Sequence, residues 1–366
     1  MAVSRVLEVL VMILVVVPLA YGQSSESEYD AWLAANQAKY QDSVTALGTP
    51  PAVGDFVTVA ADSPPASPSC IRYVGKKGSG AKYSKVKSAV KSIPDGMTER
   101  CVIYVGEGVW EEKFEIPKTK GPITLKGVSA LKSVIQYGDY AEKAGSTSKS
   151  ATVAVMSDYF KAEDITFSNT HPPPPGGAVG QQAVAFRIEG DKAEFYRVAF
   201  LGGQDTLYDK KGRHYYKDCY IKGSIDFIFG AGNAFFERCN LASIANPGSG
   251  SLTAQKKTSK NEMSGFVFYG CLVTGNGPIY LGRAWGTYSK VVFVYTDIQA
   301  PIYPEGWFNW GDPKREKTVY YGQYKCYGPG ADTSGRVSWS KDLSDEQAKP
   351  FLSTDFVDGS SWIGKK

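Results

Sequence analysis

Two aspartates in the middle of the chain sit in stretches that are otherwise apolar. Asp205 belongs to GGQDTLYD, and Asp226 belongs to GSIDFIFGAGNAFF, where isoleucine and phenylalanine side chains flank it. A strand this apolar is expected to be buried, and a buried carboxylate is costly unless a nearby group pairs with it. The sequence therefore predicts a charged site in the fold and a cation close to it.

The spacing of the two aspartates suggests that they act together. The interval from Asp205 to Asp226 equals the step between two similar strand positions, Val198 and Cys219. If these strands stack in register, they lie about 4.7–4.9 Å apart, so the two carboxylates are close neighbours and their titrations are coupled. Two carboxylates in different environments can divide the roles of acid and nucleophile.

Two glutamines accompany this acid pair. Gln204 precedes Asp205, and Gln182, in GQQAVAFRIEG, lies one more interval of nearly the same length before Gln204, so it is expected one coil further back. Amide side chains beside the carboxylates could stabilise an oxyanion. The alternative is that these residues form only a ladder of stacked polar side chains, and spacing alone leaves both interpretations open.

Arg283 is the cation that could pair with the buried carboxylate. It lies in YLGRAW (Tyr280–Trp285), an otherwise apolar segment. A guanidinium can bind a carboxylate through two hydrogen bonds and hold it ionised. Trp285 could offer an apolar face to a sugar ring, although an ordinary surface contact between the two residues is the alternative.

These residues need a fold that stacks similar strands, and the chain contains such a repeat. The segments YFKAEDITF, EFYRVAFLG, HYYKDCYIKG, AFFERCNLAS, FVFYGCLVTG and VFVYTDIQAP share a turn position at Asp164, Val198, Cys219, Cys239, Cys271 and Asp297. The shortest steps between these positions have a period of about 20, and the longer steps contain loop insertions, which is typical of solenoids. Strands dominate, so the pattern favours a parallel β-helix over the alternative, a β-sandwich.

Short helices are expected at both ends of this solenoid. Tyr83–Gly96 has apolar residues at helical spacing, and SDEQAKPFL begins with a good N-cap, Ser344. A solenoid needs capped ends to hide its open edges. We expect both helices to serve as such caps.

The N-terminal region indicates export. Residues 1–22 contain Arg5, an apolar run and small residues, which predicts a secretory signal peptide. The alternative, a signal anchor, is disfavoured by Pro18. Residues 23–69 form an extension with a Pro/Ser-rich linker, and residues 70–366 form the β-helix domain.

The composition disfavours a nucleic-acid partner and a zinc site. The formal charge of +4 suits an anionic partner, but the chain lacks the dense basic cluster of a nucleic-acid-binding protein. The six cysteines include no C-x-x-C pair, which disfavours zinc, and in a secreted chain they allow one to three disulfides.

With these residues in place, the chain resembles plant pectin methylesterases (pectinesterases), carbohydrate esterases with a right-handed parallel β-helix. The resemblance runs from about Val74 to Trp362 and includes, in family order, GEGVWEEKFEIP, SATVAV, DITFSNT, QAVAFR, QDTLYD, DFIFG, YLGRAW and GWFNW. Several independent motifs in the same order make the resemblance specific. It implies hydrolysis of the C6 methyl esters of homogalacturonan to pectate and methanol, without a metal or organic cofactor.

The resemblance also implies a role for each matched residue. Asp226 falls at the nucleophile and Asp205 at the acid/base, Gln182 and Gln204 fall at the oxyanion stabilisers, and Arg283 falls at the residue that holds the nucleophile. Thr152 and Trp285 match substrate contacts, and Trp307 is expected to line the groove. We expect Arg283 to keep Asp226 ionised, while burial or the like charge keeps the proton on Asp205.

Two departures from the family pattern and two rival functions remain. Many relatives have LGRPW and GVYRE where this chain has Ala284 and GVWEE, so we expect altered loop rigidity rather than lost activity. The inhibitor-like pro-region of many plant members is not expected here. The rivals are a pectate lyase or polygalacturonase of the same architecture, and a non-catalytic wall-binding protein.

The resemblance finally implies where the protein acts and with what. We expect a secreted protein of the cell wall that binds pectin, with no nucleic-acid partner and no membrane contact after signal cleavage. Small helical inhibitor proteins that cover the groove of such enzymes are a further candidate partner. No G-x-S-x-G motif is present, which disfavours a serine–histidine triad.

Overall fold

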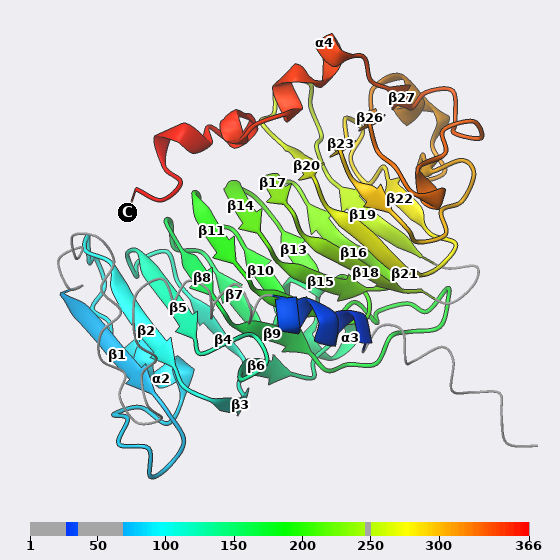
Figure 1. The fold of residues 1–366 in the computed structure, drawn as a ribbon. Helices are drawn as coiled ribbons and strands as arrows, with labels where there is room; N and C mark the ends of the chain where they lie inside the picture. Colours follow the sequence, from blue (N-terminus) through cyan, green and yellow to red (C-terminus); the bar gives the residue numbers. More distant parts are fainter. Residues whose placement is uncertain (1–26, 36–68, 246–249, 366) are drawn as a thin grey trace, which may run out of the picture.

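The chain winds through three parallel sheets that form the walls of one long coil (Figure 1). The computed structural model describes residues 27–35, 69–245 and 250–365. Successive strands pass from one sheet to the next, and each strand pairs in parallel with the equivalent strands of neighbouring coils. This arrangement confirms the predicted parallel β-helix.

The strands of each sheet follow in the order in which they are hydrogen-bonded. Sheet A contains β1 (Cys70–Val74), β2 (Cys101–Val105), β5 (Ile123–Gly127), β8 (Lys161–Glu163), β11 (Ala193–Tyr196), β14 (Arg213–Lys217), β17 (Asn233–Glu237), β20 (Gly265–Tyr269), β23 (Lys290–Val294), β26 (Tyr320–Tyr324) and β27 (Lys341–Asp342). Sheet B contains β3 (Gly108–Glu111), β6 (Ser133–Tyr137), β9 (Thr166–Asn169), β12 (Ala199–Leu201), β15 (Tyr220–Gly223), β18 (Asn240–Ile244), β21 (Leu272–Asn276) and β24 (Asp297–Ile298). Sheet C contains β4 (Phe114–Ile116), β7 (Val153–Val155), β10 (Phe186–Ile188), β13 (Leu207–Asp209), β16 (Ile225–Gly230), β19 (Ser251–Gln255), β22 (Tyr280–Arg283) and β25 (Trp307–Phe308).

A single left-handed residue marks the turn from sheet A to sheet B in coil after coil. These residues have φ between 47° and 58° and are Asp164, Arg197, Asp218, Arg238, Gly270, Tyr295 and Lys325. Each follows its strand of sheet A directly, and the strand register places them at equivalent positions of successive coils. Four of the six positions aligned from the sequence are the residue directly after this turn. The alignment was wrong by one position at Asp164, which is the turn residue itself, and at Asp297, which comes two residues after the turn.

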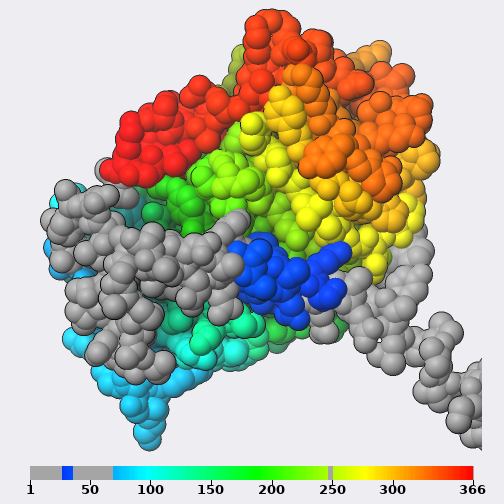
Figure 2. All heavy atoms as spheres, viewed as in Figure 1, coloured from blue at the N-terminus to red at the C-terminus, as the bar shows by residue number. Residues whose placement is uncertain are grey.

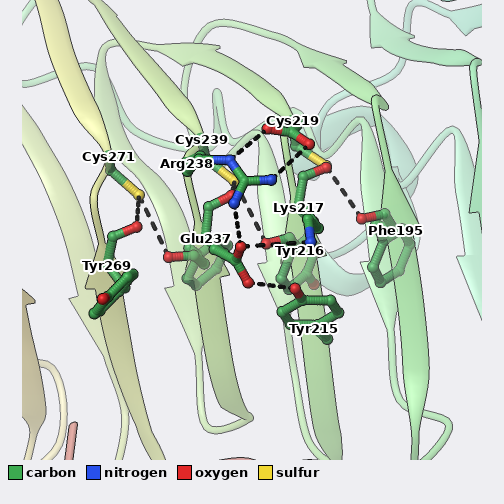
Figure 3. Close-up of polar contacts among 12 residues, drawn as sticks. Phe195, Tyr215, Tyr216, Lys217, Cys219, Glu237, Arg238, Cys239, Tyr269 and Cys271 are labelled. Atoms are coloured by element: carbon green, nitrogen blue, oxygen red, sulfur yellow. Dashed lines mark hydrogen bonds and ion pairs between the residues drawn. The ribbon is translucent and has the colours of Figure 1, made fainter. Parts of the chain in front are cut away.

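The residue after this turn points into the core, and three consecutive coils place a cysteine there. Cys219, Cys239 and Cys271 are buried free thiols that donate to backbone carbonyl groups at 3.4–3.7 Å, as Figure 3 shows. The one disulfide among the six cysteines joins Cys70 to Cys101 across β1 and β2. Three of the cysteines thus serve as small core residues.

The predicted N-terminal cap is present, although its helix is shorter than predicted. α2 spans Val86–Lys91 and buries Val86, Ala89 and Val90 in the main core. The carboxylate of Glu112 accepts hydrogen bonds from two backbone N–H groups at the start of this helix, which satisfies donors that a helix end leaves open.

The C-terminal helix forms as predicted but does not cap an end. α4 (Asp345–Ala348) begins at Ser344 with a complete capping box. The chain then continues through η4 (Lys349–Phe351), η5 (Thr354–Val357) and η6 (Gly359–Ser361) along the outside of sheet A (Figure 1, red). Its apolar side chains pack against the outward residues of β14, β17, β20 and β23. The expectation of a second cap was wrong, because this face of sheet A is itself apolar and needs a cover.

Part of the N-terminal extension packs against sheet B. Residues 27–35 form a helix that lies across the outside of this sheet (dark blue in Figures 1 and 2). Trp32 and Leu33 of this helix pack with Tyr220 and Ala242 of the sheet. The predicted signal peptide, residues 1–22, lies outside the described residues. Within the described ranges, no helix is long and apolar enough to cross a membrane.

Two further short helices lie in the loop that leads from β6 of sheet B to β7 of sheet C. α3 spans Ala141–Ala144, and η1 spans Thr147–Ser150. The remaining helical turns, η2 (Pro313–Lys317) and η3 (Pro329–Ala331), lie near the C-terminal coils.

Candidate active site

Asp205 and Asp226 occupy equivalent positions at the entrance to neighbouring strands of sheet C. β13 pairs with β16 in register, and the backbone N–H of Asp205 donates to the carbonyl of Ile225 at 3.0 Å. Both aspartates have left-handed backbone conformations, with φ of 62° and 50°, a region that non-glycine residues rarely adopt. The two aspartates therefore stack one coil apart, as their spacing predicted.

A bulge helps to direct Asp226 outward. The register between β16 and β19 shifts between Ile225 and Ile228, so that β16 carries one extra residue at this point. Bulges of this kind re-aim a side chain and are frequent near active sites. Phe227 turns into the core, while the carboxylate of Asp226 stays on the outer face with 6% of the residue exposed.

Arg283 binds the carboxylate of Asp226 through both of its oxygens. Its Nε donates to Oδ1 at 2.8 Å, and its Nη2 donates to Oδ2. Arg283 lies on β22, two strands from β16 (Figure 1). To reach Asp226, its side chain must therefore cross the intervening strand β19. The predicted pairing of this arginine with the buried aspartate is therefore present in the structure.

The residue that Arg283 crosses is small. Ala254 of β19 stands between Phe229 and Arg283 in the strand register, on the outward column of sheet C. It is 2% exposed and belongs to the same apolar cluster as Phe229 and Trp285. A larger side chain at this position would occupy the space over which the guanidinium reaches Asp226.

Asp205 differs from Asp226 in its electrostatic surroundings. Burial raises the pKa of Asp205 well above its usual range, the negative charge of Asp226 raises it further, and Arg283 only partly opposes them. Asp226 therefore has a cation in direct contact, whereas Asp205 has conditions that favour its protonated form. A cation beside Asp226 and a raised pKa at Asp205 were both expected from the sequence.

The two predicted glutamines lie beside the acid pair, at equivalent places in neighbouring coils. The backbone N–H of Ala183 donates to the carbonyl of Gln204 at 3.0 Å, just as the N–H of Asp205 donates to the carbonyl of Ile225. Ala183 thus takes the place of Asp205 one coil earlier, and Gln182 takes the place of Gln204. Gln182 therefore lies one coil behind Gln204, as predicted.

The equivalent placement of Gln182 and Gln204 depends on a local irregularity in the backbone. The N–H groups of Ala185 and Phe186 both donate to the carbonyl of Thr206, at 2.9 and 3.3 Å, so the earlier coil holds one extra residue there. The carbonyl of Gln182 accepts from the N–H of Ala141 at 2.8 Å, which ties it to α3. The Oε1 atom of Gln204 is buried and has no hydrogen-bond partner among the described residues.

An aromatic surface extends from the acid pair across the outer face of sheet C. Tyr208 stacks on Phe229 with ring centroids 4.2 Å apart, and Phe229 lies 6.1 Å from Trp285. The guanidinium of Arg283 lies 4.6 Å from the ring centroid of Trp310. The sequence analysis missed Trp310, although the second tryptophan of GWFNW was a signal that could have pointed to it.

The residue before Trp285 is fixed by backbone contacts. The N–H of Ala284 donates to the carbonyl of Phe308 at 2.9 Å, which a proline at this position could not do. Arg315 donates to the carbonyls of Ala284 and Trp285. The loop that carries Trp285 is therefore anchored on both sides.

Two predicted substrate contacts are contradicted by burial. Trp307 is 2% exposed and stacks on Tyr321 inside the coil, at 4.4 Å between ring centroids. It faces inward because it pairs in register with Gly282, whose missing side chain leaves room for the indole, and the adjacent Phe308 is the exposed residue. Thr152 is fully buried, and its hydroxyl donates to a backbone carbonyl at 3.0 Å.

His214 lies inside the coil and takes no part in this site. It is fully buried, and its ring nitrogens contact Asp209 Oδ2 and the carbonyl of Gly190, each at 2.8 Å. Tyr216 donates to the same carboxylate of Asp209 at 2.6 Å. This histidine and its aspartate therefore serve the core rather than a serine–histidine triad.

Comparison with known proteins finds one family. The family model described as Pectinesterase matches residues 72–360. The chain is 46% identical over 288 residues to the Arabidopsis thaliana protein named "Probable pectinesterase 8", covering 77% of this chain and 73% of that protein.

Solved structures agree with this match. Carrot pectin methylesterase has a TM-score of 0.74 and 33% identity, covering 82% of this chain and 97% of that one. A pectin methylesterase in complex with a hexasaccharide has a TM-score of 0.66 and 26% identity, covering 78% of this chain and 96% of that one.

The path of Arg283 over β19 yields a prediction about stability. Ala254→Leu should displace the guanidinium and leave Asp226 as a poorly paired charge, so it should lower the free energy of unfolding. In an Asp226→Asn background the same leucine should cost less, by about 1–3 kcal/mol, because the buried carboxylate that would lose its partner is gone. Urea unfolding of the wild type, both single variants and the double variant measures this coupling.

Ala254→Gly is the matched control for this measurement. Glycine keeps the space above β19 open, so its cost should be the same in both backgrounds. An equal cost of the leucine in both backgrounds would contradict the role assigned to Ala254.

Proposed function

Because the chain belongs to the pectinesterase family and therefore hydrolyses the methyl esters of pectin, we propose that Asp226, Asp205 and Arg283 form its catalytic centre. The single observation that carries this proposal is the stacked acid pair in which only one carboxylate has an arginine in direct contact. The activity itself converts a methyl ester to a free carboxylate and methanol. The proposal concerns which residues perform each step.

In the first step, a carboxylate oxygen of Asp226 attacks the C6 carbonyl carbon of a methylated galacturonate. The carbonyl oxygen of the ester becomes an oxyanion, which the amides of Gln182 and Gln204 stabilise. Asp205 gives its proton to the methoxy oxygen, the bond from C6 to that oxygen breaks, and methanol leaves an acyl-enzyme at Asp226.

In the second step, water hydrolyses this acyl-enzyme. Asp205, now ionised, takes a proton from the water, and the resulting hydroxide adds to the same carbonyl carbon. The bond to Asp226 breaks, which restores its carboxylate and releases the demethylated galacturonate. Asp205 is protonated again and ready for the next ester.

The electrostatics support this assignment of roles. A nucleophile is best placed beside a cation, and Asp226 accepts two hydrogen bonds from Arg283. An acid must carry a proton, and the raised pKa of Asp205 favours its protonated form. The different surroundings of the two carboxylates thus suit the different roles proposed for them.

We also propose that Trp285 and Trp310 contact the polysaccharide. Both belong to the partly exposed edge of the aromatic cluster on sheet C. Lys256 lies 4.0 Å from the ring centroid of Trp285, so one side of this indole already faces a cation. A similar enzyme has been solved with a bound hexasaccharide, which supports an extended polysaccharide as the ligand of this aromatic surface. We further propose that the enzyme acts on homogalacturonan of the cell wall, outside the cell.

A test of the catalytic pair uses near-isosteric substitutions. Asp226→Asn and Asp205→Asn should each keep the fold but release methanol from methylated pectin at less than about a tenth of the wild-type rate. Asp218→Asn, which changes an aspartate at the turn from sheet A to sheet B that pairs with Arg238, is the control and should remain active. Retained activity of Asp226→Asn would refute its role as nucleophile, and a chain-cleavage assay on the same samples separates esterase from lyase or galacturonase activity.

We propose a small helical inhibitor protein as a second partner that covers the aromatic surface beside the acid pair. Among the departures from the family pattern, Trp110 of β3 is 3% exposed and Ala284 is fully buried, so neither alters the surface. Glu111, the other changed residue of GVWEE, is exposed, but it lies on β3 of sheet B and not on the outer face of sheet C. Calorimetric titration at acidic pH with a plant inhibitor of pectin methylesterases should therefore show a stable complex and a loss of methanol release. Absence of binding to every such inhibitor would contradict this proposal.

A further inference from the structure

A serine lies beside Asp226 on the next coil, in register with the residue that precedes Asp226. Ser251, the first residue of β19, pairs in register with Ile225, directly beside Asp226. It is 1% exposed, and nothing in the mechanism above uses it. Ser251 lies on the strand that Arg283 crosses, and its side chain contacts Asp226, the proposed nucleophile.

The hydroxyl of Ser251 contacts Asp226 twice. The backbone N–H of Asp226 donates to Oγ of Ser251 at 3.0 Å, and the same Oγ is within hydrogen-bond distance of Oδ1. A backbone N–H can only donate, so Oγ is the acceptor in the first contact. Its single hydrogen is then free to be donated to the carboxylate.

These contacts stabilise the unusual backbone conformation of Asp226. Asp226 has a φ of 50° and lies where the register of β16 shifts, so its backbone conformation is not secured by a regular ladder. The hydroxyl holds the backbone and the side chain of Asp226 at once. Loss of the hydroxyl would free both.

The hydrogen bonds also distinguish the two oxygens of Asp226. Oδ1 accepts from Ser251 and from Nε of Arg283, whereas Oδ2 accepts from Nη2 of Arg283. Each carboxylate oxygen has two lone pairs. Both lone pairs of Oδ1 are therefore engaged, and Oδ2 keeps one that can attack.

We propose that Ser251 is a positioning residue that holds Oδ1 so that Oδ2 of Asp226 is the attacking atom. This proposal depends on the assignment of Asp226 as nucleophile. In the acylation step, a bond forms between Oδ2 and C6, the bond from C6 to the methoxy oxygen breaks, and methanol takes its proton from Asp205. Oδ1 becomes the carbonyl oxygen of the Asp226 acyl group and continues to accept from Ser251.

The test compares Ser251→Ala with Ser251→Thr in the full chain. Removal of the hydroxyl should lower kcat for methanol release about ten- to a hundredfold, the effect of losing a hydrogen bond to a charged group. KM should change less than about twofold, because the hydroxyl is buried behind the nucleophile and does not touch substrate. Threonine keeps the hydroxyl and should restore kcat to within about fivefold of the wild type.

The split between kcat and KM and the rescue by threonine are readouts that a purely structural role would not move. Ser243→Ala is the control, because it removes another buried serine hydroxyl, that of Ser243 on β18, which accepts from the N–H of Ala245. This control should leave both kcat and KM unchanged.

Three outcomes are decisive. A reduced kcat with a nearly unchanged KM, rescued by threonine, supports the proposal. A wild-type kcat in Ser251→Ala, while Asp226→Asn is inactive, overturns the role of Ser251 and leaves the catalytic pair intact. If Asp226→Asn is active, the proposed function fails first, and the role of Ser251 fails with it.

Discussion

The ion pair between Asp226 and Arg283 is the interaction on which the rest of the site depends. A carboxylate that is almost fully buried on an apolar strand requires a partner, and Arg283 supplies two hydrogen bonds from two strands away. The pair can form only because the coils between the two residues are in register and because Ala254 leaves the path over β19 open. The geometry of the site is therefore a property of the stacked coil rather than of a single loop.

The two aspartates differ in their surroundings because Arg283 contacts only one of them. Burial raises the pKa of Asp205, the negative charge of Asp226 raises it further, and Arg283, which binds Asp226, opposes the rise only in part. Two chemically similar aspartates thus lie in different electrostatic environments. The same guanidinium packs on Trp310, so it also connects the acid pair to the aromatic surface on which a polysaccharide could lie.

The sequence predicted the parts of the site that depend on spacing and residue type. The interval that matches one coil placed Asp205 and Asp226 on one ladder, and the cost of burying a charge pointed to Arg283. The sequence did not show which residues of a strand point out of the coil near a left-handed turn. Trp307 was therefore placed outside the coil, although its register with Gly282 turns it inward.

Other features could not be predicted from the sequence, because they depend on the lengths of loop insertions or on a surface that many coils assemble together. An insertion before β19 makes this coil longer than the one before it, so the repeat interval did not reveal that Ser251 lies beside Asp226. The C-terminal segment showed its N-cap at Ser344 but not its destination, because the apolar face of sheet A that it covers is assembled from many coils. The family resemblance supplied the chemistry but could not supply these placements.

The most direct test of the central claim is to measure methanol release and thermal unfolding for Arg283→Lys and Arg283→Ala. Lysine keeps the charge but loses the planar fork, so kcat should fall more than binding, with a modest loss of stability. Alanine should be worse in both respects, because it leaves the buried charge of Asp226 unpaired, a change that costs on the order of 3 kcal/mol. If Arg283→Ala were as stable and as active as the wild type, Asp226 would not depend on this arginine, and the account of the site would be wrong.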